Sequence, residues 1–106
     1  QNIDLKSSKV TLMGYTFKEN CSDIRNTKVH DLAISLKNAG VFINIWDPFL
    51  TKESQELLNQ LDIYAFNEKP NDVEIAFICV YHQQILDFLD TYKGIMYDFK
   101  KLNKNL

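Results

Sequence analysis

The chain has 106 residues, of which 45% are hydrophobic and 25% are charged, and its formal net charge is -2. These values are typical of one globular domain and exclude a disordered or fibrous chain. The slightly acidic balance excludes a global basic field for nucleic acid, so any anion site must be local. The longest apolar run, residues 75–81, is far too short to span a membrane.

The cysteines and the first residue indicate the context of the domain. Cys21 and Cys79 lie far apart and lack the spacing of a metal site or a disulfide framework, which predicts a reducing, cytoplasmic location. The chain opens with Gln1 rather than methionine, which favours a piece of a longer polypeptide. We expect one domain over residues 1–106, with residues 1–8 as a lead-in and 101–106 as a tail.

The first half of the chain predicts a strand, a helix and a second strand. Residues 9–14 are apolar and β-branched and end in glycine, as in a buried strand that enters a turn. Apolar residues then recur at helical spacing from Asn26 to the stop signal Gly40, which predicts a helix of about four turns. Residues 41–46 predict the second strand, which Asp47-Pro48 ends.

The second half repeats this alternation. Residues 52–61 predict an amphipathic helix and residues 62–66 a short strand. The nearly continuous apolar run at 73–81 predicts a central parallel strand covered on both faces. A helix at 83–92 and a last strand at 94–99 follow, and the lysine- and asparagine-rich stretch after them predicts a linker or a frayed end.

Alternating strands and helices predict the fold class. We expect an α/β domain, a three-layer α/β/α Rossmann-like sandwich with a mostly parallel sheet of about five strands. In such sheets the ligand crevice lies beyond the carboxyl ends of the strands. The polar candidates should therefore lie in the loops after Gly14, Trp46, Tyr81 and Phe99.

The loop over residues 14–28 is dense in hydrogen-bonding groups. Its single glycine is not the G-x-G-x-x-G fingerprint, so the domain is not expected to bind NAD alone. Lys18 and Arg25 lead into a helix N-terminus, an arrangement that suits phosphate. Ordinary surface pairs with Glu19 and Asp23 are the alternative interpretation of the same two cations.

The segment from Gly14 to Val29 resembles a known family. It reads GYTFKENCSDIRNTKV and is similar to the G-x-[TA]-F-K-x-x-x-x-D-x-R-x-[ST] segment of the UDP-glucose/GDP-mannose dehydrogenase family. The similarity is greatest to the branch that oxidises UDP-N-acetylhexosamines in polysaccharide synthesis. Trp46-Asp47-Pro48 is similar to the family's Y-D-P, and the resemblance is weakest over residues 50–72.

This resemblance implies a function for the chain within a larger enzyme. The family oxidises the C6 hydroxyl of a UDP-sugar twice with two NAD, and it combines an NAD-binding, a central and a UDP-binding domain. This chain resembles the third, C-terminal one. The family's nucleophilic cysteine lies in the central domain, so no catalytic residue is expected here and Cys21 is not that nucleophile. The expected partners are a UDP-sugar, the remaining domains of the same polypeptide and further subunits of a homo-oligomer.

The resemblance also assigns roles to individual residues. Phe17 and Lys18 match the pair that contacts the UDP-sugar, and Arg25 matches the arginine that reaches the NAD of the first domain. Tyr97-Asp98-Phe99-Lys100 is similar to the family's D-G-R or D-x-K segment, in which the basic residue contacts the UDP-sugar of a neighbouring subunit. Lys100 takes that place, with a solvated tail charge as its alternative.

Other polar residues are better explained structurally. Asp47 could recognise a ribose, but capping of the following turn is the favoured interpretation. His82 is favoured as a hydrogen-bonded loop histidine over a general base, and His30 as a solvated residue. The aromatic residues predicted to lie in the core are Trp46, Phe77 and Phe88.

Two other function classes fit the sequence less well. A free-standing receiver-like regulatory module would need an acidic pair after its first strand, where this chain has Gly14-Tyr15. An independent nucleotide-binding enzyme would need a phosphate loop and a nucleophile with its base, which the sequence lacks.

Overall fold

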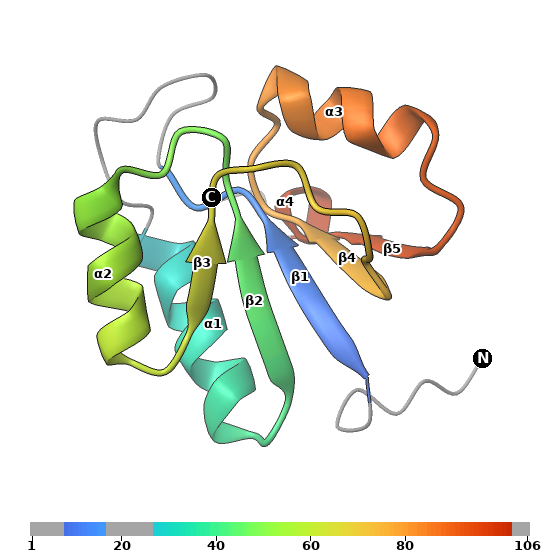
Figure 1. The fold of residues 1–106 in the computed structure, drawn as a ribbon. Helices are drawn as coiled ribbons and strands as arrows, with labels where there is room; N and C mark the ends of the chain where they lie inside the picture. The colour runs from blue at the N-terminus through green and yellow to red at the C-terminus, as the bar shows by residue number, and fades with distance from the viewer. Residues whose placement is uncertain (1–7, 17–26, 103–106) are drawn as a thin grey trace.

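The structure, a computed structural model, describes residues 8–16 and 27–102. It contains a five-stranded parallel sheet with the strand order β3-β2-β1-β4-β5 (Figure 1). The strands are β1 (Lys9–Met13), β2 (Phe42–Trp46), β3 (Tyr64–Phe66), β4 (Ile75–Ile78) and β5 (Ile95–Asp98). The helices are α1 (Thr27–Asn38), α2 (Lys52–Gln60), α3 (Gln83–Asp90) and α4 (Phe99–Leu102).

Helices cover the sheet from both sides, which confirms the predicted α/β sandwich. In Figure 1, α1 and α2 lie on one side of the sheet and α3 on the other. Side chains alternate between the two faces of a strand. Val10 and Leu12 of β1 therefore join the core cluster under α1 and α2, whereas Met13 joins the cluster under α3.

Trp46 anchors the smaller cluster. Its side chain is only 2% exposed and meets Phe88 of α3 edge to face, with the ring centroids 5.4 Å apart. Phe77 and Phe88 pack against the two clusters but remain partly exposed. The prediction that these aromatic residues belong to the core is thus confirmed, most fully for Trp46.

Two elements differ from the sequence-based prediction. Strand β4 is shorter than residues 73–81, because the N–H groups of Cys79 and Val80 both donate to the Met13 carbonyl and the chain leaves the regular ladder there. The stretch after β5 begins as helix α4, where a linker or frayed end was expected. Asp98 Oδ1 accepts the Lys101 N–H at 2.9 Å, which satisfies a donor in the first turn of α4.

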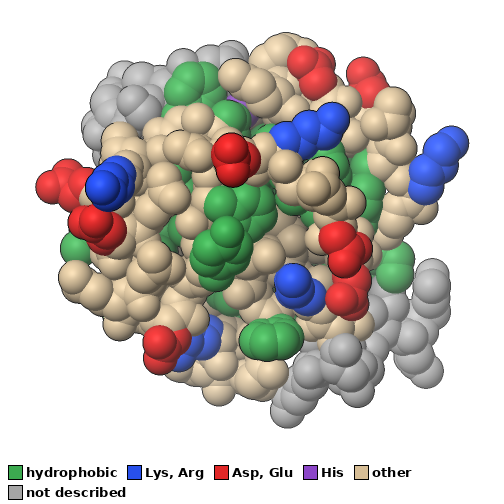
Figure 2. All heavy atoms as spheres, viewed as in Figure 1, with side chains coloured by type: hydrophobic (Ala, Val, Ile, Leu, Met, Phe, Trp, Pro, Cys, Tyr) green, Lys and Arg blue, Asp and Glu red, His purple; other side chains and the backbone are tan. Residues whose placement is uncertain are grey.

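The sheet face that carries α3 is not covered evenly. Figure 2 shows apolar side chains gathered near the middle of this face, over β2 and β3. The exposed apolar residues of these two strands are Phe42 and Tyr64. They belong to the half of the sheet away from the carboxyl edge, where no described helix covers this face. Among the residues that the structure describes, no helix has the length and apolarity needed to cross a membrane.

Candidate functional site

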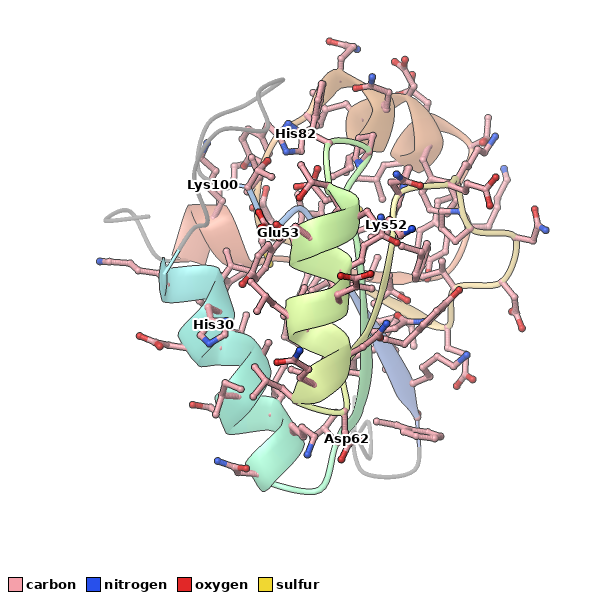
Figure 3. The ribbon with its side chains drawn as sticks, turned by 60° about the vertical axis from the view of Figure 1, so that its left-hand side comes forward. His30, Lys52, Glu53, Asp62, His82 and Lys100 are labelled. Atoms are coloured by element: carbon pink, nitrogen blue, oxygen red, sulfur yellow. The ribbon has the colours of Figure 1, made fainter. Side chains whose placement is uncertain are left out.

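The loops after β1, β2 and β4 meet at the carboxyl edge of the sheet. They bring together Thr16, Asp47 and His82, which lie 31 to 66 positions apart in the sequence. All three side chains are buried, with Asp47 and His82 fully inaccessible. Figure 3 shows His82 at this end of the molecule, with Lys100 also toward it.

Asp47 is the centre of this group because both of its carboxylate oxygens accept hydrogen bonds. Oδ2 accepts the N–H groups of Tyr15 and Thr16 at 2.7 and 2.9 Å and the Thr16 hydroxyl at 3.0 Å. Oδ1 accepts the Phe49 N–H at 2.7 Å, which closes the turn after β2. The predicted cap is therefore confirmed, and the same carboxylate also holds the loop after β1.

His82 completes the group from the loop after β4. Its Nε2 lies 2.9 Å from Asp47 Oδ2 and 2.8 Å from Thr16 Oγ1. An ionised carboxylate can only accept, so Nε2 must carry a proton to bond Asp47. His82 also occupies the N-cap position of α3, and its ring packs 4.9 Å from the Phe49 ring. The expectation of a hydrogen-bonded loop histidine is confirmed.

The pKa of Asp47 reports the balance of these contacts. Burial acts to raise the pKa of this carboxyl, but the hydrogen bonds from His82, Thr16 and Tyr15, with the charge of His82, outweigh burial and lower it. Asp47 is therefore a carboxylate at neutral pH and carries a buried negative charge.

Gly14 allows the loops after β1 and β4 to approach closely. Its φ is +103°, a backbone conformation that other residues rarely adopt. A Cβ atom here would lie 2.6 Å from Val80 Cβ and 2.8 Å from Val80 N. The two loops are thus in direct contact at the point where strand order reverses, the usual place of a ligand crevice.

The described part of this edge does not fit a dinucleotide held in the usual way. A Rossmann cradle binds pyrophosphate with free backbone N–H groups after the first strand. Here the N–H groups of Tyr15 and Thr16 donate to Asp47, and Val80 fills the space beside Gly14. Among the described residues of this edge, these two N–H groups are therefore already occupied.

A second polar group lies where β4 and β5 end. The Tyr81 hydroxyl donates to Asp98 Oδ2 at 2.6 Å, and Lys100 Nζ lies 4.8 Å from the centre of the Tyr81 ring. Lys100 is half-buried and belongs to α4. The Tyr81 ring and the helix hold this cation at the same edge as Asp47.

A hollow of about 300 Å³ opens between the end of β2 and α3. Its walls combine aromatic and polar groups, as small-molecule sites do. The residues that line it are Trp46, Pro48, Asn67, Lys69, Gln84, Asp87 and Phe88.

The sequence-predicted site residues divide into two groups. Phe17, Lys18, Arg25 and Cys21 lie outside the described residues. Lys100 is described and lies at the predicted edge.

One interpretation was wrong. His30 is half-buried rather than fully solvated, and the hydroxyl of Tyr15, from the loop after β1, lies 3.0 Å from His30 Nδ1.

Sequence reasoning missed the joint role of Thr16, Asp47 and His82. The available signal was position, since Asp47 and His82 each follow the end of a predicted parallel strand. Among the described residues, no group of three or more His, Cys, Asp or Glu side chains could hold a metal ion.

The decisive comparison is with protein families. Residues 11–104 match the UDP binding domain of the UDP-glucose/GDP-mannose dehydrogenase family. The chain belongs to this family. That membership favours the resemblance over the receiver-like alternative.

Individual relatives agree with the family. The chain is 33% identical over 85 residues to a UDP-N-acetyl-D-glucosamine 6-dehydrogenase of Salmonella typhi, covering 79% of this chain and 20% of that protein. It is 42% identical over 53 residues to the Pseudomonas aeruginosa protein of the same name, covering 50% and 13%. It is 30% identical over 106 residues to Protein CapL of Staphylococcus aureus, covering 94% and 25%.

The chain thus spans at most a quarter of the length of these curated relatives. No solved structure matches it significantly.

Proposed function

We propose that residues 1–106 form the C-terminal UDP-sugar-binding domain of an NAD-dependent UDP-sugar 6-dehydrogenase that serves polysaccharide synthesis. In this proposal the domain binds and positions the substrate. The catalytic cysteine and most of the NAD site belong to other domains of the same polypeptide. The intact enzyme oxidises C6 of a UDP-N-acetylhexosamine to the uronate and assembles as a homo-oligomer.

The observation that carries the proposal is the family match over residues 11–104, because the matched domain is described as UDP-binding. The names of the Salmonella and Pseudomonas relatives support UDP-N-acetylglucosamine as the substrate. The occupied N–H groups of Tyr15 and Thr16 are consistent with NAD being held mainly elsewhere.

Four residues carry the proposed contacts. Phe17 and Lys18 bind the UDP-sugar, with Lys18 as a point charge near the diphosphate. Arg25 reaches the NAD of the first domain, where its fork-shaped guanidinium suits a pyrophosphate. Lys100, held at the carboxyl edge by α4 and Tyr81, binds the UDP-sugar of a neighbouring subunit.

A titration of the chain with UDP, followed by backbone NMR, tests the proposal. We expect saturable shifts within residues 14–25. Lys18→Ala should weaken UDP binding about tenfold, because a charge-assisted contact to phosphate is lost. Lys37→Ala is the matched control, since it removes one positive charge from the last turn of α1 at the opposite end of the sheet. If both variants weaken UDP binding equally, Lys18 acts only through the net charge of the chain and does not contact UDP.

Two kinetic tests in the full-length enzyme address the remaining roles. Arg25→Ala should weaken NAD more than the UDP-sugar, and equal losses measured by calorimetry would remove the assignment. Lys100→Ala should raise the KM for the UDP-sugar in the intact oligomer, whereas an unchanged KM would argue against a substrate contact.

A further inference from the structure

The buried carboxylate of Asp47 holds three backbone N–H groups as well as the His82 ring. A fully buried ion is expensive to desolvate, and apolar packing alone can join loops. Asp47 nevertheless uses Oδ2 for the N–H groups of Tyr15 and Thr16, and Oδ1 for that of Phe49. It therefore fixes the paths of the chain after β1 and after β2 relative to one another.

Thr16 is held through both its backbone and its side chain. Both its N–H and its hydroxyl donate to Asp47 Oδ2, and Oγ1 also lies 2.8 Å from His82 Nε2. A shared Nε2–H can thus reach Asp47 and Thr16 together. In the sequence, Thr16 directly precedes Phe17 and Lys18.

We propose that Asp47 and His82 are positioning residues: they hold Thr16, the residue that directly precedes the proposed binding pair Phe17 and Lys18 in the sequence. The inference rests on the proposed function, which assigns substrate binding to that pair. Its physical basis is preorganisation, because a segment whose first residue is already ordered loses less conformational freedom when it binds a ligand.

A purely structural role predicts something different. If the group served only to stabilise the fold, its removal would lower the unfolding midpoint but leave the UDP affinity of the folded chain unchanged. A positioning role predicts a loss of affinity under conditions where each variant is fully folded. It also predicts that a conservative replacement restores the affinity.

Thr16 offers a matched pair of variants. Thr16→Val removes the hydroxyl with little change in shape, and Thr16→Ser keeps the hydroxyl. Thr11→Val is the control, since Thr11 is also buried and its Oγ1 has no hydrogen-bond partner among the described residues. We expect Thr16→Val to weaken UDP binding about tenfold, and Thr16→Ser and Thr11→Val to stay close to the wild type.

His82 offers a second pair. His82→Gln can place an amide N–H near the position of Nε2, whereas His82→Leu removes the donor. We expect His82→Leu to weaken UDP binding about as much as Thr16→Val, and His82→Gln to recover most of the affinity. NMR titrations of the chain with UDP, well below the unfolding midpoint of each variant, measure both pairs.

Each outcome separates the inference from the proposed function. A wild-type chain that binds UDP, with Thr16→Val and His82→Leu folded and binding equally well, overturns the inference and leaves the proposed function standing. A full-length enzyme that shows no saturable UDP binding overturns the proposed function, and the inference with it.

If the variants fail to fold, a measurement on the wild-type chain alone still tests the inference. Coupling between two sites is reciprocal, so UDP bound by Phe17 and Lys18 should slow amide hydrogen exchange at Tyr15 and Thr16. We expect exchange at Tyr15 and Thr16 to slow at saturating UDP by at least about fivefold more than exchange at the amides of β5, which reports the gain in global stability. Binding of UDP without extra protection at Tyr15 and Thr16 would contradict the inference.

Discussion

At Gly14 the backbone passes so close to Val80 that no side chain fits between them. Gly40 offers a comparison within the same chain, because its φ of +88° is also positive but a Cβ atom added there would meet nothing within 4 Å. Both glycines thus adopt a positive φ, but only Gly14 is packed closely against another residue.

We expect Gly14→Ala to destabilise the chain much more than Gly40→Ala. A positive φ costs alanine about 1–2 kcal/mol at either position. At position 14, forcing the Cβ against Val80 adds about 1–3 kcal/mol. Urea unfolding of both variants measures the difference in free energy of unfolding. Equal losses would mean that the loops after β1 and β4 can separate without cost.

Cys79 is the second residue whose environment leads to a prediction. Its side chain is 1% exposed, and burial, aided by the charge of Asp98, raises the pKa of the thiol. The thiolate is the reactive form, so Cys79 should alkylate very slowly in the native chain at pH 8. Peptide mass spectrometry after iodoacetamide treatment measures the labelling, and the urea-unfolded chain is the control. Rapid labelling of the native chain at Cys79 would show that the core around β4 opens frequently.

At the scale of elements, a row of aromatic rings holds α3 on the sheet. Trp46 meets Phe88 edge to face, and Phe88 stacks on Tyr92 at a centroid distance of 5.5 Å. The Tyr92 hydroxyl lies 3.0 to 3.1 Å from the carbonyls of Val73, Glu74 and Ile95. Tyr92 therefore links the end of α3 to the starts of β4 and β5.

We expect Tyr92→Phe to destabilise the chain by about 1 kcal/mol, because the carbonyls of Val73, Glu74 and Ile95 lose the hydroxyl donor that they share while the ring stack is kept. Tyr64→Phe is the matched control, since the Tyr64 ring is 63% exposed on β3 and the loss of its hydroxyl should change stability by less than about 0.5 kcal/mol. Thermal unfolding of the two variants makes the comparison. A Tyr92→Phe chain as stable as the control would mean that water satisfies these carbonyls.

At the scale of the whole molecule, local sequence patterns predicted most helices and strands, but they did not predict contacts between residues far apart in the sequence. Periodicity located the strands and the first three helices because burial of one face leaves a pattern of 2.0 or 3.6 residues. The sequence pattern predicted a β4 that is too long, because a run of apolar residues indicates that they are buried but not that their backbone groups pair with a neighbouring strand. It missed α4, whose start depends on the bond between Asp98 and the Lys101 N–H.

The candidate site was predictable only in part. Parallel topology places Asp47 and His82 at one edge, and that followed from the sequence. Their contact with each other and with Thr16 joins loops 31 to 66 positions apart, and no local pattern encodes it. The loop pattern marked Lys18 and Arg25 as suited to phosphate, and the family resemblance gave the specific roles of these two residues and of Phe17. All three lie outside the described residues, so their roles stay predictions.

The stability of the whole domain should depend on pH through Asp47. Its pKa is lowered in the folded chain from an ordinary value near 4, so the folded state holds its proton less tightly than the unfolded state. The stabilisation is therefore fully present above the unfolded pKa and is lost as the pH falls through the folded pKa. Each unit between the two values corresponds to about 1.4 kcal/mol.

We expect Asp47→Asn to be less stable than the wild type at pH 7, by on the order of 2–3 kcal/mol, and the gap to narrow as the pH falls below about 4. Asp62→Asn is the charge-matched control: it removes an exposed carboxylate at φ +60°, a conformation that asparagine tolerates. Urea midpoints from pH 7 to pH 2.5 measure all three chains. The control should follow the wild type throughout, because its carboxylate holds no loop. A gap between Asp47→Asn and the wild type that stays constant down to pH 2.5 would mean that the contacts of Asp47 act through shape, and that its charge contributes nothing to the fold.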